Sequence, residues 1–161
     1  MYESLPSISI IIPAKDEQTY IGRCLDAVGE LNYPKNKLEI IIVDNNSKDN
    51  TKQIASSYKG HKVLSTNGTI SAVRNFGGKQ SQSDFLAFLD SDCIPEKDWL
   101  LKATSILDSH KDVAVVGATL ALEPSSNPPW IESCWLDYLN SKFENGNNYV
   151  TTISSFCFVV R

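Results

Sequence analysis

The sequence lacks several features that mark special classes of protein. Over its 161 residues no apolar run approaches the roughly 18 residues of a membrane-spanning helix, so we expect no membrane span in this chain. Residues 1–7 lack the basic start and apolar core of a signal peptide. Lysine and arginine are scattered and the formal net charge is −4, which argues against a nucleic-acid partner because phosphate binding needs clustered cations. We therefore expect a cytoplasmic protein, either free or peripheral to the inner face of the membrane.

Cysteine and histidine are too sparse and too dispersed for a structural zinc site. The chain has four cysteines and two histidines, with no Cys-X-X-Cys pair and no histidine close to a cysteine. We expect Cys24, Cys93, Cys134 and Cys157 to be buried free thiols in a reducing compartment.

Glycine-rich phosphate loops are also absent. No Gly-X-Gly-X-X-Gly follows the first apolar run and no Gly-Lys-Ser/Thr occurs, which argues against a dinucleotide oxidoreductase and a P-loop phosphotransferase. The polar run at 44–50 lacks the central glycine and the terminal glutamate of an EF-hand loop, so we do not expect it to bind calcium. A phosphate ligand would then have to be held by a cation and by side chains.

Apolar strands alternate with amphipathic helices along the chain. Hydrophobic residues make up 42% and charged residues 21%, an ordinary balance for one globular domain. Buried strands are predicted at 7–13, 38–43, 62–65, 85–89, 113–122 and 153–160. Helices are predicted at 21–28, after a cap at Ser47 or Asp49, at 70–80, at 95–107 and at 130–143. Such alternation predicts an α/β fold, with a mostly parallel sheet and helices on both faces.

Two finer predictions concern proline and glycine. We expect Pro13 to end the first strand, because proline has no backbone N–H to donate to the ladder. The helix at 70–80 contains two glycines, which indicates close backbone packing or a nearby ligand. Its inward face is predicted to carry Ala72, Val73, Phe76 and Gly77.

Polar loops follow four of the strands, and two of their carboxylates stand one residue apart. The strand at 85–89 ends in Asp90 and Asp92. In an open α/β sheet the crevice at the carboxyl ends of the strands binds ligands, so this pair could share Mg²⁺ or Mn²⁺ with a diphosphate. The alternative is that Asp-Ser-Asp is a turn and a cap for the next helix. These residues alone leave both interpretations open.

Four short motifs in order carry a resemblance to a known family. They are Ile-Ile-Ile-Pro-Ala-Lys-Asp-Glu at 10–17, Ile-Ile-Val-Asp-Asn-Asn-Ser-Lys-Asp-Asn-Thr at 41–51, Ala-Val-Arg-Asn-Phe-Gly at 72–77 and Phe-Leu-Asp-Ser-Asp at 88–92. Their order and spacing resemble the nucleotide-sugar half of family 2 glycosyltransferases with the GT-A fold. The resemblance implies one Rossmann-like, donor-binding domain over residues 1–161, without the family's C-terminal acceptor half.

The resemblance also implies roles for residues of the donor site. Pro13, Ala14 and Glu17 would line the nucleoside pocket, and Asp44 would hydrogen-bond the base, which is usually uracil. Arg74 stands where the family's Ala-X-Arg-Asn motif places a donor-side residue.

The acidic turn would complete the donor site. In the implied arrangement Asp90 contacts the ribose or the metal, Ser91 belongs to the nucleotide-sugar site, and Asp92 ligates the Mg²⁺ or Mn²⁺ that bridges the diphosphate.

The implied activity is metal-dependent transfer of a sugar, with inversion, from a UDP-linked donor to a saccharide or lipid-linked acceptor. Glu123 and Asp137 are the nearest candidates for a general base, but both are also typical surface acids, so no base is assigned. The alternative is a non-catalytic nucleotide-sugar-binding fragment or module. A nucleotidyltransferase is disfavoured because the glycine-rich, arginine-containing loop after the first strand is absent.

Two departures from the family pattern and one aromatic segment remain open. The family most often shows Tyr-Asn-Glu at 15–17 and Asp-Asp-Gly-Ser at 44–47, where this chain has Lys-Asp-Glu and Asp-Asn-Asn-Ser, which leaves the identity of the base open. The aromatic helix predicted at 130–143 has three interpretations, which are ordinary core, contact with a C-terminal half, or a surface for self-association.

Overall fold

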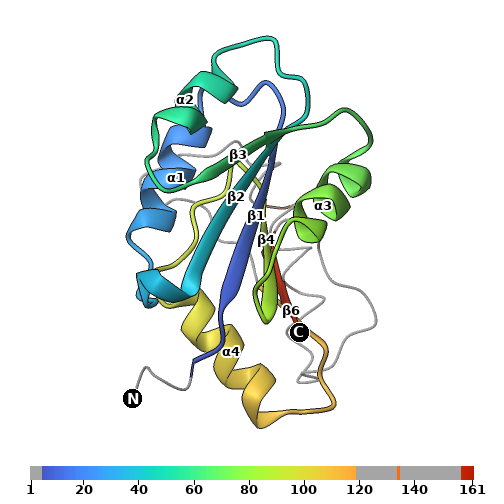
Figure 1. The fold of residues 1–161 in the computed structure, drawn as a ribbon. Coiled ribbons are helices and arrows are strands. Elements are labelled where there is room, and N and C mark those ends of the chain that lie inside the picture. Colours follow the sequence, from blue (N-terminus) through green and yellow to red (C-terminus); the bar gives the residue numbers. More distant parts are fainter. Residues whose placement is uncertain (1–4, 119–133, 135–156) are drawn as a thin grey trace.

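The computed structural model describes residues 5–118, Cys134 and residues 157–161. Its strands are β1 (Ile8–Ala14), β2 (Leu38–Asp44), β3 (Lys62–Ser65), β4 (Phe85–Leu89), β5 (Val115–Gly117) and β6 (Cys157–Val160). Its helices are α1 (Ile21–Gly29), the short 3₁₀ helix η1 (Lys35–Lys37), α2 (Thr51–Ser57), α3 (Ile70–Lys79) and α4 (Trp99–Ser109) (Figure 1). None of the helices in these described ranges is long and apolar enough to cross a membrane.

The strands form one mostly parallel sheet in the order β3-β2-β1-β4-β6-β5. β1 pairs in parallel with β2 on one side and β4 on the other, and β3 adds in parallel to β2. β6 is antiparallel to both of its neighbours, β4 and β5. The predicted α/β class and the mostly parallel sheet are therefore confirmed.

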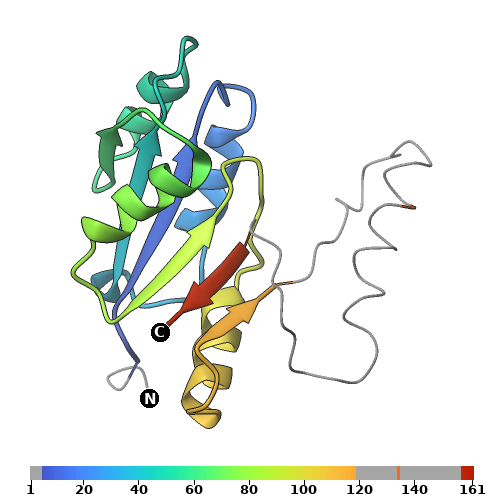
Figure 2. The same ribbon diagram turned by 90° about the vertical axis from the view of Figure 1, so that its right-hand side faces the viewer.

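Successive residues of β1 point to opposite faces of the sheet, and helices cover both faces. Ile10 and Ile12 pack with buried residues of α1, α2 and α4 in one core cluster. Ile11 packs on the other face with Val73 of α3. Figure 2 shows this arrangement, with α3 on one side of the sheet and α1 and α4 on the other. The β-branched, apolar strands are thus buried on both faces, as expected for parallel strands.

Pro13 does not end β1, so that prediction is wrong by one residue. Pairing with β2 continues to Ala14, which lies opposite Asp44, whereas pairing with β4 ends at Ile11. The Ala14 C=O accepts the Asn45 N–H at 2.8 Å on the β2 side. Because backbone groups of successive strand residues point to alternate sides, the missing N–H of Pro13 lies on the side that is no longer paired, and the proline removes no ladder bond.

The start of α4, the cap of α2 and the buried face of α3 differ from the predictions. α4 begins at Trp99 and not at Pro95, so residues 95–98 belong to a loop. The N-cap of α2 is Asn50, although Asp49 accepts the Thr51 N–H at 2.9 Å. In α3, Val73 and Gly77 are buried, but Ala72 is exposed because it lies on the face away from the sheet.

Several predictions fall partly or wholly outside the described residues. β5 covers residues 115–117 of the strand predicted at 113–122, of which residues 113, 114 and 118 are described but not in a strand, and β6 covers residues 157–160 of the strand predicted at 153–160. Of the aromatic helix predicted at 130–143, only Cys134 is described, and it is exposed. Both candidate bases, Glu123 and Asp137, also lie outside the described residues.

Close packing explains a glycine in α3. A Cβ atom at Gly77 would lie 2.5 Å from Ile11 Cγ2, which is shorter than a real side chain tolerates, and 3.0 Å from Val43 Cγ2, which is tighter than most real contacts. The absence of a side chain lets α3 lie directly on β1 and β2. The prediction of close backbone packing in this helix is confirmed.

Ser7 and Asp84 tie the start of β1 to the start of β4. The Ser7 N–H donates to Asp84 Oδ2 at 2.8 Å, the Ser7 hydroxyl donates to the same oxygen at 2.7 Å, and the Asp84 N–H donates to Ser7 Oγ at 2.9 Å. The bonds from the Ser7 N–H and hydroxyl lower the pKa of the Asp84 carboxyl, because both stabilise its charged form.

Replacing Gly77 with alanine should destabilise the fold, because the new methyl group would force α3 away from β1. We expect Gly77→Ala to lower the free energy of unfolding by about 1–3 kcal/mol, measured by urea denaturation. Gly29→Ala is the matched control, since a Cβ there meets nothing within 4 Å and alanine is the better helix former. Equal stability of the two variants would contradict the packing argument.

The Ser7–Asp84 pair should make stability depend on acid pH. The lowered pKa of Asp84 means that its stabilising contribution is present above its unfolded pKa of about 4 and is lost as the pH falls through the lower folded pKa. Wild type should therefore exceed Asp84→Asn in unfolding free energy at pH 7, and the difference should shrink below about pH 4. A difference that stays constant from pH 7 to pH 2.5 would refute this role of the carboxylate.

Candidate functional site

A cavity of about 300 Å³ opens at the carboxyl ends of β1, β2 and β4. β2 lies on one side of β1 and β4 lies on the other, so the strand order reverses at β1. In open α/β sheets, ligands bind at the carboxyl ends of the strands where the order reverses, and the cavity lies at this point. Its lining comes from four separate segments and consists of Pro13, Ala14, Lys15, Glu17, Asn45, Ile70, Val73, Arg74, Asp90, Ser91 and Asp92.

All the predicted site residues except Asp44 line this cavity. Asp44 is only 4% exposed, and its Oδ1 accepts the Ser47 N–H at 3.4 Å. It is the last residue of β2, whereas the next residue, Asn45, does line the cavity. The base-binding role of Asp44 stays a prediction.

Hydrogen bonds join the loop after β1 to the loop after β2. The Asp16 N–H donates to Ser47 Oγ at 3.0 Å, and Asp16 Oδ1 accepts the Lys48 N–H at 2.7 Å. The Glu17 N–H donates to Thr51 Oγ1 at 2.7 Å. These bonds hold Glu17 at the cavity by its backbone and leave its carboxylate to face a ligand.

A second group of bonds extends this connection to the start of α2. The Gln18 N–H donates to Asp49 Oδ2 at 3.0 Å, and Gln18 Oε1 accepts the Asn50 N–H at 3.2 Å. The polar run that superficially resembles a calcium loop therefore binds the neighbouring loop of its own chain.

Two residues in these loops have a left-handed backbone, and both stand at positions where this chain differs from the family pattern. Asp16 has a φ of 56° and Asn46 a φ of 58°. Asparagine and aspartate tolerate this region better than other residues with a side chain. Asn46 therefore fits the turn at the position where the family most often has glycine, and the change preserves the loop.

Asn45 holds the loop between β3 and α3 beside the cavity. Its Nδ2 donates to the Gly68 C=O and its Oδ1 accepts the Gly68 N–H, both at 3.0 Å. Thr69 then caps α3, accepting the Ala72 N–H at 3.3 Å.

Sequence reasoning missed four residues that line the cavity, which are Asn45, Lys15, Ile70 and Val73. The position of Asn45 directly after a strand end was the available signal.

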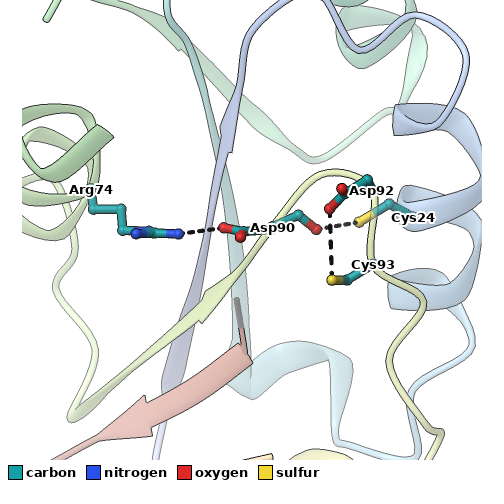
Figure 3. Close-up of polar contacts among 5 residues, drawn as sticks. All are labelled: Cys24, Arg74, Asp90, Asp92 and Cys93. Carbon is teal, nitrogen blue, oxygen red and sulfur yellow. Dashed lines mark hydrogen bonds and ion pairs between the residues drawn. The ribbon is translucent and has the colours of Figure 1, made fainter. Parts of the chain in front are cut away.

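The acidic pair forms a turn at the end of β4. The Cys93 N–H donates to the Asp90 C=O at 3.1 Å, which closes the turn. Arg74 Nη2 of α3 lies 2.5 Å from Asp90 Oδ1 (Figure 3). The turn interpretation is thus confirmed, but the cap interpretation is wrong because α4 begins only at Trp99.

Two cysteines donate hydrogen bonds to the acidic turn on the side away from Arg74. Cys24 Sγ of α1 donates to the Asp90 C=O and Cys93 Sγ donates to Asp92 Oδ1, both at 3.7 Å (Figure 3). Burial raises the pKa of both thiols to about 12, so both keep the proton that they donate. All four cysteines are free, as predicted, but only Cys24 and Cys157 are buried, whereas Cys93 is half-buried and Cys134 exposed.

Carboxylates crowd this rim of the cavity. Burial raises the pKa of Glu17, and the charges of Asp92 and Asp49 raise it further. Burial also raises the pKa of Asp90, although the Arg74 guanidinium opposes that shift. A divalent cation would relieve this repulsion, and hard cations prefer carboxylate oxygens.

The turn can hold such a cation only with help. Among the described residues no group of three histidine, cysteine or acidic side chains could hold a metal ion. Mg²⁺ is usually bound by one or two carboxylates together with phosphates of a substrate. Asp92, with Asp90 beside it in the same turn, fits that kind of shared site, and the turn does not form an all-protein one.

Comparisons with known sequences agree with the resemblance. The model of glycosyl transferase family 2 matches residues 9–161. Glycosyltransferase AglE of Haloferax volcanii is 40% identical over 127 residues, which are 74% of this chain and 41% of AglE. The poly(ribitol-phosphate) β-N-acetylglucosaminyltransferase TarS of Staphylococcus aureus is 34% identical over 115 residues, which are 67% of this chain and 20% of TarS. The chain thus spans less than half the length of these relatives.

Solved structures share the fold. TarS 1–349 of S. aureus in complex with UDP has a TM-score of 0.72 at 25% identity, and the match covers 94% of this chain and 46% of that one. The mannosyltransferase PcManGT of Pyrobaculum calidifontis, solved with GDP-Man and Mn²⁺, has a TM-score of 0.73 at 20% identity over 96% of this chain and 44% of that one. These likenesses confirm the predicted GT-A type of fold.

The two hydrogen bonds between Asn45 and Gly68 should contribute measurably to the stability of the protein. Asn45→Asp keeps the acceptor for the Gly68 N–H but places a carboxylate oxygen against the Gly68 C=O, so we expect about 1 kcal/mol less stability and faster amide exchange at Gly68. Asn46→Asp is the matched control, because the Asn46 side chain accepts from Lys48 and an aspartate can do the same. Equal exchange at Gly68 in both variants would rule out this role for Asn45.

Proposed function

The chain belongs to glycosyl transferase family 2, and from that premise we propose that its cavity binds the nucleoside diphosphate of an activated sugar. The observation that carries this proposal is the meeting of Glu17, Arg74 and the acidic turn at one cavity, although they come from separate parts of the chain. Its volume of about 300 Å³ lies within the range of small-molecule sites.

UDP is the nucleotide that we expect in this cavity. The TarS structure with 25% identity was solved with UDP, and the match covers nearly the whole chain. Arg74 lines this cavity, and its guanidinium carries N–H donors of the kind that bind anionic ligands. Asp44, at the end of β2, is the proposed partner of the base.

A divalent cation, Mn²⁺ or Mg²⁺, is proposed to bind at the acidic turn together with the diphosphate. Asp92 would hold it, and Asp90 lies beside it in the same turn. When bound, such an ion stabilises the negative charge of a diphosphate leaving group as a Lewis acid. The Cys93 thiol donates to Asp92 Oδ1 and so orients that carboxylate.

The proposed reaction is transfer of the sugar, with inversion, to a hydroxyl of a saccharide or lipid-linked acceptor. The acceptor oxygen forms a bond to the anomeric carbon while the bond to the diphosphate breaks, and a general base takes the hydroxyl proton. No described residue is assigned as that base.

A second candidate is a nucleotide-sugar-binding module without turnover. Assays of UDP-sugar hydrolysis and transfer separate the two, because a module would bind the nucleotide and release no UDP from its sugar.

Titration calorimetry with UDP, with and without Mn²⁺, tests the proposal. We expect UDP to bind in the presence of Mn²⁺, and Asp92→Asn to weaken that binding at least tenfold by removing the carboxylate that faces the ion. Glu96→Gln is the control, since Glu96 is an exposed acid that pairs with Lys102 away from the cavity. No heat from UDP or any other nucleoside diphosphate would overturn the proposed function.

A further inference from the structure

The geometry points to Arg74 as a positioning residue that withholds Asp90 from the cation, so that the chain takes up a divalent ion only together with a diphosphate. This inference rests on the proposed function, and it goes beyond it by stating why the protein alone is a poor metal site. Three features of the structure support it, which are the ion pair, the rigidity of its support and the shortage of other ligands.

The ion pair occupies one of the two carboxylates of the turn. Arg74 Nη2 lies 2.5 Å from Asp90 Oδ1, and the two side chains are 12% and 30% exposed. Partial burial strengthens such a charge-assisted hydrogen bond relative to an exposed pair. Asp90 therefore has its charge balanced before any ligand arrives.

α3 cannot easily carry Arg74 away from Asp90. Gly77 lies three residues further along α3, on the same side of the helix, and a Cβ there would already clash with Ile11 and Val43. The helix is thus held directly on β1 and β2, while Asp90 follows β4, which pairs with β1. The two charged groups come from elements that share one rigid core.

Few other ligands are available at the turn. The two thiols beside it already donate hydrogen bonds, from Cys24 to the Asp90 C=O and from Cys93 to Asp92 Oδ1. No cluster of three metal-binding side chains exists in the described ranges 5–118 and 157–161. With Asp90 paired, Asp92 is the carboxylate of the turn that remains for a cation.

The arrangement predicts that metal binding depends on the nucleotide. A hard cation needs about six oxygen ligands, and the carboxylates left at this rim supply too few for tight binding, so diphosphate oxygens must complete the set. Removal of the guanidinium would free a second carboxylate and delete a nearby positive charge. Both changes would raise the affinity of the protein for the ion in the absence of nucleotide.

The experiment measures Mn²⁺ binding without nucleotide, from the electron paramagnetic resonance signal of free Mn²⁺. We expect Arg74→Met to bind Mn²⁺ about three- to tenfold more tightly than wild type, because a positive charge near the ion is gone. Arg74→Lys keeps the charge and should stay near wild type. Lys79→Met removes a positive charge at the exposed end of α3 and should leave Mn²⁺ affinity unchanged.

The double variant Arg74→Met/Asp90→Asn shows whether that gain comes from the freed carboxylate. It should lose most of the gain, because it removes that carboxylate and restores the local net charge of wild type. Unchanged or weaker Mn²⁺ binding by Arg74→Met, or a gain that survives in the double variant, would each overturn the inference. If Arg74→Met does not fold, Arg74→Gln, which also removes the positive charge, takes its place.

The outcome is distinguishable from failure of the proposed function. UDP binding by wild type tests the donor site, whereas the Mn²⁺ measurement contains no nucleotide. Binding of UDP without any effect of Arg74 on Mn²⁺ would reject only the positioning role.

Discussion

The parallel pairing of β1 with both β2 and β4 is the constraint on which the rest of the structure depends. Because all three strands run the same way, their carboxyl ends meet at one edge, and the residues that follow them are forced together. The strands are almost wholly apolar and buried, so their register is held by the core on both faces. The site is a consequence of where these strands end.

Many of the polar residues at this edge support the loops. Asp16, Asp49 and Asn45 all use their side chains to bind backbone groups of a neighbouring loop. This internal bonding removes freedom from the loops before any ligand binds, which lowers the entropy lost on binding. It also leaves the carboxylates of Glu17 and Asp92 at the cavity, where mutual repulsion favours a cation.

Much of this fold could be predicted from the sequence, because apolar runs and helical spacing are local signals. The four parallel strands and the cavity-lining residues carried by the resemblance belong to this part. What could not be predicted depends on contacts distant in sequence, such as Arg74 with Asp90 and Asn45 with Gly68. The position of Asp44 was also beyond local reasoning, since one residue at a strand end decides between a buried and a cavity-facing side chain.

The central claim is that one cavity at the ends of β1, β2 and β4 binds the diphosphate of an activated sugar. A crystal structure of the protein with UDP and Mn²⁺ tests it most directly. We predict the diphosphate between Arg74 and the acidic turn, with the ion on Asp92 and the base beside the end of β2. Ordered UDP bound on another face of the sheet, with this cavity holding only water, would contradict the account.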